Sequence, residues 1–106
     1  MLIEKSSIKK GCMGGKTILL TGSGGGIGFE AARTLAWLGA RVIIAEINKG
    51  KGLDAERRIN EEVGGSLAEF YEIDLSDESQ IRQMAKYIKG KYGFLDVVFN
   101  NGQNFF

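Results

Sequence analysis

The chain has 106 residues, of which 43% are hydrophobic and 25% are charged, and its formal net charge at pH 7 is +1. This length and composition fit one globular domain, and the near-neutral charge gives no reason to expect a nucleic acid or a membrane as partner. The sequence contains no histidine, which excludes imidazole bases and most zinc sites, so we expect no metal site. The single cysteine and the lack of a long apolar run favour a cytoplasmic protein.

The first part of the chain predicts an extension followed by a strand and a helix. Residues 1–14 show no sustained periodicity and are interpreted as an N-terminal extension ahead of a domain over residues 15–106. Residues 17–20 are apolar and β-branched, as in a buried strand. Residues 29–38 carry apolar side chains at helical spacing and are followed by Gly39, which favours the end of a helix.

Two further strand and helix pairs follow. Residues 40–47 resemble a parallel strand that is buried on both faces, and a polar turn over 48–52 leads to a predicted helix over 53–63. A third strand is predicted over 67–73. Ser76 is the expected N-cap of the last helix, whose apolar positions have regular helical spacing. These positions are Ile81, Met84, Ala85, Ile88 and Tyr92.

A fourth strand over residues 95–99 completes a β-α-β-α-β-α-β pattern. With right-handed crossovers, this pattern predicts an α/β fold with a doubly wound parallel sheet, Rossmann-like and partial, with three helices. The four strands should lie in the order 3-2-1-4, with two helices on one face and one on the other. A ligand should bind at the carboxyl ends of strands 1 and 4. The apolar surface left on these two strands predicts a homo-oligomer.

The turn after the first strand holds five glycines within seven residues, at Gly22, Gly24, Gly25, Gly26 and Gly28. Glycine permits a tight turn and close approach of a ligand to the backbone, and the free N–H groups of the following helix attract an anion. A flexible linker is the alternative, but the turn lies between a predicted strand and a predicted helix. The sequence therefore predicts a phosphate or pyrophosphate site.

A second glycine-containing segment resembles a P-loop but does not satisfy its pattern. Only three residues separate Gly11 from Gly15, where the P-loop has four, and Thr17 begins a strand where the P-loop threonine begins a helix. We therefore exclude this type of nucleotide site.

The pattern T-G-x-x-x-G-I-G, formed by Thr21, Gly22, Gly26, Ile27 and Gly28, resembles the cofactor loop of the short-chain dehydrogenase/reductase family. The resemblance extends over residues 14–102 and covers only the N-terminal, cofactor-binding part of a family member. It implies an oxidoreductase that transfers hydride between NAD(P) and an alcohol or carbonyl substrate.

Glu46 ends the second predicted strand, 18 residues after Gly28. An acid at this position can accept hydrogen bonds from the adenosine ribose hydroxyls and repel a 2′-phosphate, which favours NAD over NADP as the cofactor. Lys49 and Lys51 follow closely and could hold a 2′-phosphate instead. A solvated loop acid is the other interpretation of Glu46.

The resemblance implies two more cofactor contacts at strand ends. Asp74-Leu75 occupies the place where the family has an acid near the adenine amino group, although Asp74 could equally be the lead-in to a helix cap. Asn100-Asn101 resembles the start of the family's N-N-A-G motif, from which the chain departs at Gly102 and Gln103. The residues expected to contact the dinucleotide are Gly22, Gly24, Gly25, Gly26, Ile27, Gly28, Glu46, Asp74, Leu75, Asn100 and Asn101.

The family's catalytic Tyr-x-x-x-Lys pair lies downstream of N-N-A-G, so no catalytic residue is expected in this chain. Tyr87 and Lys91 have this spacing, but they precede the fourth strand and are interpreted as a chance match. We expect the chain to be inactive alone, and to meet a small-molecule substrate only when a C-terminal part is supplied. A non-catalytic nucleotide-binding or assembly module is an alternative interpretation. So is a methyltransferase-like nucleoside binder, against which the Thr21-Gly22 opening of the loop counts.

Overall fold

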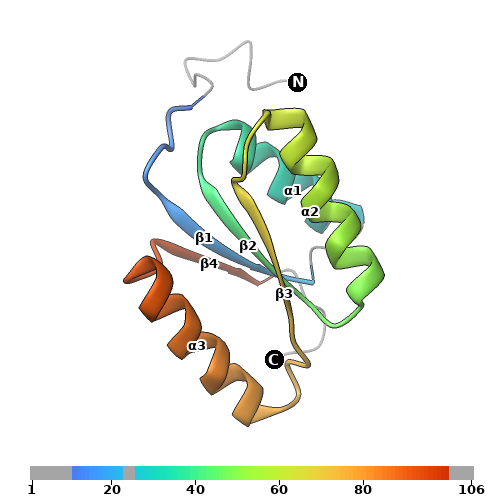
Figure 1. Cartoon of the computed structure of the whole chain (residues 1–106), viewed down its shortest axis with the longest axis vertical. Coiled ribbons are helices and arrows are strands. Elements are labelled where there is room, and N and C mark those ends of the chain that lie inside the picture. Colours follow the sequence, from blue (N-terminus) through green and yellow to red (C-terminus); the bar gives the residue numbers. More distant parts are fainter. Residues whose placement is uncertain (1–10, 23–25, 101–106) are drawn as a thin grey trace.

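The computed structural model describes residues 11–22 and 26–100. Its elements are β1 (Thr17–Thr21), α1 (Gly26–Trp37), β2 (Arg41–Glu46), α2 (Lys49–Val63), β3 (Ala68–Glu72), α3 (Glu78–Tyr92) and β4 (Val97–Asn100). All strand pairs are parallel and the sheet order is β3-β2-β1-β4, which confirms the predicted doubly wound topology (Figure 1). Among the described helices, none is long and apolar enough to cross a membrane.

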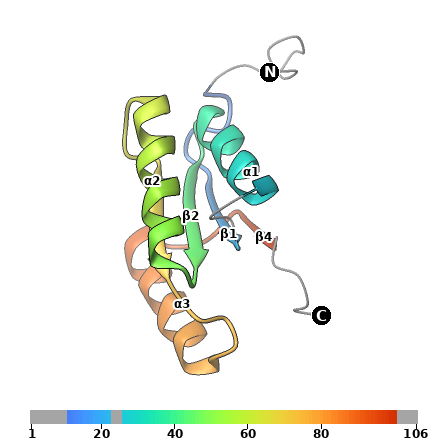
Figure 2. The same ribbon diagram turned by 90° about the vertical axis from the view of Figure 1, so that its right-hand side faces the viewer.

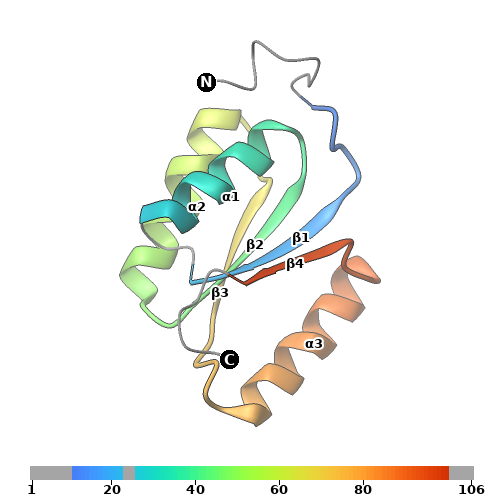
Figure 3. The ribbon, with the colours of Figure 1, turned by 180° about the vertical axis from the view of Figure 1, so that it is seen from behind.

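The helices cover the two faces of the sheet unequally, as the sequence predicts. α1 and α2 lie together on one face, and α3 lies on the other (Figures 1 and 3). The core under α1 and α2 includes Phe29 and Ile59, and the smaller core under α3 includes Met84 and Ile88. β2 is the central element because Val42–Ala45 are fully buried between the two layers.

The direction of winding reverses at β1. This strand pairs with β2 on one side and with β4 on the other, so that Thr21 lies opposite both Ala45 and Asn100. β1 and β2 run in the same direction and end at the same edge of the sheet (Figure 2). In an open α/β sheet, ligands bind in the crevice outside such carboxyl ends.

α2 begins earlier than predicted, at Lys49, and the predicted turn over residues 48–52 is wrong. The side chain of Asn48 caps the helix by accepting a hydrogen bond from the Lys51 N–H at 2.9 Å. Gly52 then lies inside the helix at its contact with β3, where a Cβ atom would be 2.1 Å from the ring of Phe70. The glycine therefore permits close packing of the helix on the sheet. In the sequence, the same glycine made the first turn of α2 resemble a loop.

The predicted N-cap of α3 is also wrong by one residue. Asp77 accepts hydrogen bonds from the N–H groups of Ser79 and Gln80, whereas the Ser76 hydroxyl donates back to Asp74. The loop between β3 and α3 therefore ends one residue later than expected, and Ser76 is available for another role.

The outer edge of β3 is covered by side chains from α2. Asn60 exchanges two hydrogen bonds of 2.9 Å with the backbone N–H and carbonyl of Ala68. The Phe70 N–H donates to Glu56 at 2.7 Å. These contacts occupy outward-facing backbone groups that would otherwise be open to another strand.

Candidate dinucleotide site

A cavity of about 260 Å³ lies beyond the carboxyl ends of β1, β2 and β3. Four of the predicted site residues line it, namely Gly22, Glu46, Asp74 and Leu75. They come from three separate segments, each directly following or ending a strand. The fold therefore brings together, at one edge, Gly22, Glu46 and Asp74, which are 24 to 52 positions apart in the chain.

The glycine turn begins directly after β1. Gly22 has a φ of +66°, which glycine adopts without a steric penalty, and its N–H donates to the Ala45 carbonyl at 2.9 Å. α1 starts at Gly26 and has no acidic residue in its first turn, so no carboxylate there offsets the positive end of the helix dipole. Gly28, in the first turn of α1, is buried.

Part of the predicted site cannot be placed. Gly24, Gly25 and Asn101 lie outside the described residues. Gly26 and Ile27 form the first residues of α1, and Asn100 ends β4 opposite Thr21, at the carboxyl edge where the cavity lies.

Glu46 is half-buried and its carboxylate is oriented by the backbone that follows β2. Its Oε2 accepts a hydrogen bond from the Asn48 N–H at 2.9 Å, and its own carbonyl accepts one from the Ile73 N–H at 3.1 Å. Lys49 and Lys51 are exposed on the first turn of α2, and neither lines the cavity. Among the residues that the structure describes, the charged groups that line this cavity are therefore carboxylates and not lysines.

Asp74 is held by the loop that follows β3. Its Oδ1 accepts hydrogen bonds from the Ser76 hydroxyl at 2.7 Å and from the Ser76 N–H at 3.0 Å. These hydrogen bonds lower the pKa of the Asp74 carboxyl below its ordinary value of 3.8, so the group is a carboxylate at neutral pH.

Four lining residues, Ala45, Ile47, Ile73 and Ser76, were not predicted as site residues. Ile47 is 62% exposed, and its position next to Glu46 is the only sequence signal that could have indicated it.

The Tyr87–Lys91 pair lies on α3 and does not line the cavity. Lys91 Nζ donates to Glu69 and to the Tyr87 hydroxyl, each at 3.1 Å, while Tyr87 and Tyr92 both donate to the Glu69 carboxylate. Glu69 is near the start of β3, so this cluster lies toward the amino edge of the sheet, away from the cavity.

The pKa values in the cluster around Glu69 also differ from those expected of a proton-transfer site. Hydrogen bonds to Tyr87 and Glu69 raise the pKa of Lys91. Burial and the Glu69 carboxylate raise the pKa of Tyr92. Both groups are therefore held in their protonated forms, and the cluster acts as a clamp between α3 and β3. Within the described residues, no group of histidine, cysteine or acidic side chains could hold a metal ion.

Comparison with known proteins identifies the family. The family model for short chain dehydrogenases matches residues 16–103. Short-chain dehydrogenase reductase 5 of Arabidopsis thaliana is 36% identical over 87 residues, which cover 82% of this chain and 32% of that protein. The (-)-isopiperitenone reductase of Mentha piperita is 38% identical over 85 residues, covering 78% of this chain and 27% of that protein. The chain thus spans about a third of the length of these relatives.

Solved structures agree with the fold and with the family. A short chain dehydrogenase from Shigella flexneri, complexed with NADP, has a TM-score of 0.83 and 35% identity, over 89% of this chain and 40% of that one. Menthone neomenthol reductase from Mentha piperita has a TM-score of 0.77 and 32% identity, over 82% of this chain and 31% of that one. The chain belongs to the short-chain dehydrogenase/reductase family and corresponds to its NAD(P)-binding region.

Proposed function

We propose that this chain is the cofactor-binding part of an oxidoreductase that transfers hydride between NAD and an alcohol or carbonyl substrate. The observation that carries the proposal is the convergence of Gly22, Glu46 and Asp74 on one cavity at the carboxyl edge of the sheet. When bound, NAD supplies the carbon that accepts or donates the hydride. The residues described here bind and orient that cofactor.

The groups around the cavity fit the parts of a dinucleotide. The start of α1 offers backbone N–H groups and a positive dipole to the pyrophosphate. Glu46 accepts hydrogen bonds from the ribose hydroxyls, and Asp74 accepts one from an amino group on the base. Ile47 offers exposed apolar surface to the base itself. The proposal also includes cofactor contacts from the glycine turn and from Asn100-Asn101, as the family resemblance implies.

The Glu46 carboxylate is the reason to expect NAD rather than NADP. A second negative charge on the ribose would lie close to it in a partly buried cavity, where repulsion is weakly screened. The two nearby lysines are exposed and do not line the cavity.

Titration calorimetry with NAD and NADP tests this preference. We expect wild type to bind NAD about tenfold more tightly than NADP, and Glu46→Gln to remove most of that difference by improving NADP binding. Glu72→Gln is the matched control, because Glu72 lies opposite Glu46 on the neighbouring strand and does not line the cavity. A wild-type preference for NADP would overturn the role of Glu46, and no binding of either would overturn the proposed function.

The second part of the proposal concerns assembly: the chain self-associates through β4. The edge of β3 is covered by Asn60 and Glu56, but β4 is the other edge of the sheet and carries no charged residue. Val97 and Val98 are 45% and 59% exposed. Because neighbouring residues of a strand point to opposite faces, apolar surface is open on both sides of this edge.

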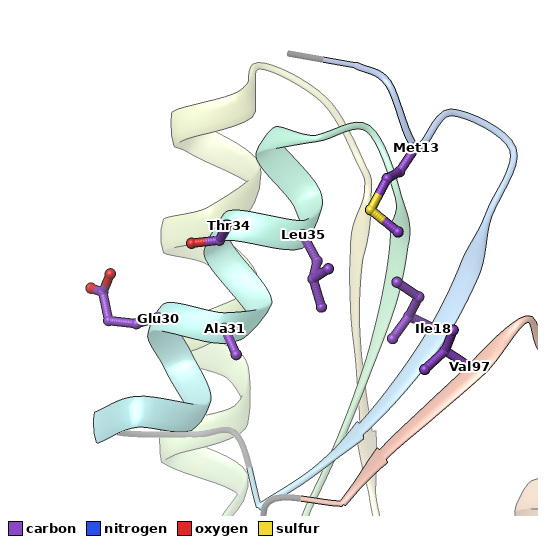
Figure 4. Close-up of a pocket in the computed structure, with 7 residues that line it drawn as sticks. All are labelled: Met13, Ile18, Glu30, Ala31, Thr34, Leu35 and Val97. Carbon is purple, nitrogen blue, oxygen red and sulfur yellow. The ribbon is translucent and has the colours of Figure 1, made fainter. Parts of the chain in front are cut away.

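Two apolar cavities lie near this edge of the sheet, and the first of them is lined by a residue of β4. One of about 450 Å³ lies between α1 and the strands, and Met13, Leu35, Ile18 and Val97 surround it (Figure 4). The other, of about 370 Å³, lies along α3 and is lined by residues including Leu19, Ile81 and Phe94. An antiparallel pairing of two β4 edges is self-complementary, and it would cover apolar surface on both faces at once.

A further inference from the structure

The loop between β3 and α3 holds the Asp74 carboxylate in one orientation. Both donors of Ser76, its hydroxyl and its backbone N–H, bind the same oxygen, Oδ1. Within residues 11–22 and 26–100, Oδ2 accepts no hydrogen bond. One carboxylate oxygen is therefore fixed by the protein, and the other keeps its full capacity to accept.

The backbone of Asp74 is fixed as well. Its N–H donates to Gln80 Oε1 at 2.9 Å, and the Gln80 amide group donates in turn to Asp77 Oδ2 at 3.2 Å. The Asp74 carbonyl accepts a hydrogen bond from the Asp77 N–H at 3.0 Å. Since the main chain is anchored on both sides of the residue, the remaining freedom of Asp74 lies in its side chain, which Ser76 restricts.

This arrangement can select between ligands at the cavity that Asp74 and Ser76 both line. A carboxylate with an unused oxygen accepts a hydrogen bond from an amino group but repels a carbonyl oxygen at the same place. A site that is built to pair with a donor rejects an analogue that lacks it, because the acceptor is then desolvated without a partner. In the proposed dinucleotide function, the donor that this oxygen meets is the exocyclic amine of the adenine base.

We propose that Ser76 is a positioning residue, which holds Asp74 so that the site selects a 6-amino purine over a 6-oxo purine. The inference rests on the proposed dinucleotide function and adds to it the role of Ser76, which acts on the ligand through Asp74. Ser76 therefore acts by fixing the orientation of the Asp74 carboxylate, through the two hydrogen bonds to Oδ1.

Calorimetric titration with NAD and with its hypoxanthine analogue, nicotinamide hypoxanthine dinucleotide, tests the proposal. For wild type we expect about tenfold tighter binding of NAD, since one charged hydrogen bond distinguishes the two ligands. Ser76→Ala should lower this ratio to about threefold, because the backbone N–H still binds Oδ1. Ser76→Thr keeps the hydroxyl and should restore the ratio, and Asp74→Asn should abolish it.

Ser79→Ala is the matched control. The Ser79 hydroxyl donates at 2.8 Å to Oδ1 of Asp77, the aspartate two residues before it, just as the Ser76 hydroxyl donates to Asp74, but Ser79 does not line the cavity. A ratio that falls equally in Ser79→Ala and Ser76→Ala would overturn the proposal in favour of a general effect on the loop. The proposal would also be overturned if Asp74→Asn lowered the NAD preference while Ser76→Ala left it at the wild-type value. Failure of wild type to bind either dinucleotide would instead reject the proposed function.

Discussion

At the scale of single residues, the cluster around Glu69 shows how protonation and stability are linked. The pKa values of Lys91 and Tyr92 are raised above their ordinary values of 10.5 and 10.0. A group with a raised pKa in the folded state stabilises the protein fully below its ordinary pKa, and this stability is lost as pH rises through the folded-state value. The clamp between α3 and β3 should therefore hold at neutral pH and weaken above about pH 10.

We expect the melting temperature of wild type to fall as the pH rises above this value. Lys91→Met should melt at a lower temperature at pH 8 and show a shallower fall above pH 10, because its part of the clamp is already absent. Circular dichroism melts across this range measure both effects. Lys86→Met, which removes an exposed lysine from the same helix, should retain the wild-type profile. Parallel profiles for Lys91→Met and wild type would contradict the linkage.

The cofactor edge shows which residues a sequence can indicate. Glu46 is indicated by its place at a strand end, whereas the cofactor role of Asp74 is implied by the family resemblance. The topology then explains why both residues lie at one edge, because the carboxyl ends of parallel strands meet there. Ser76 was assigned to the helix cap, since serine and aspartate are equally good caps and stand side by side here. Only the three-dimensional path of the loop decides that Asp77 caps α3 while Ser76 binds Asp74.

At the scale of elements, too, some features follow from the sequence pattern and others depend on tertiary contacts. The strand order and the division of helices between the two faces follow from the alternation of patterns, and both are confirmed. The start of α2 was missed because two glycines in its first turn resemble a loop, although one of them is required by tertiary packing. The cover on the β3 edge was also unpredictable, since Asn60 and Glu56 are ordinary polar helix residues until β3 lies beside them.

Gly52→Ala tests the packing of α2 on β3. The added methyl group would lie 2.1 Å from two ring atoms of Phe70, so the ring or the helix must move. Overpacking outweighs the gain in helix propensity, and we expect a net loss of about 2 kcal/mol in the free energy of unfolding, measured by urea denaturation.

Gly50→Ala in the same helix is the control for that experiment. Its Cβ would meet only the Asn48 side-chain oxygen at 3.4 Å, which is close to an ordinary contact. We expect this variant to be unchanged or more stable by up to about 1 kcal/mol. Equal effects of the two substitutions would show that Gly52 is present for reasons other than its contact with Phe70.

At the scale of the whole molecule, the two edges of the sheet are treated differently. Side chains of α2 cover β3, whereas β4 carries exposed valines, one of which lines an apolar cavity. Natural sheets commonly protect an edge with charged residues, bulges or a covering segment, and an unprotected edge pairs with another strand. The relatives are about three times as long as this chain, so the surface that β4 offers here to a second copy need not be open in them.

Replacing Val97 by lysine should therefore separate the copies. A charge at this position would lie beside the cavity formed with Ile18 and Leu35, and pairing of two β4 edges would bury both charges. We expect sedimentation equilibrium to show a dimer for wild type and at least about tenfold weaker association for Val97→Lys, with an unchanged circular dichroism spectrum. Leu53→Lys is matched to it, because Leu53 is also 45% exposed but lies on α2. If Leu53→Lys weakens association as strongly as Val97→Lys, the interface lies elsewhere. If wild type is a monomer at all concentrations, β4 does not pair with a second copy.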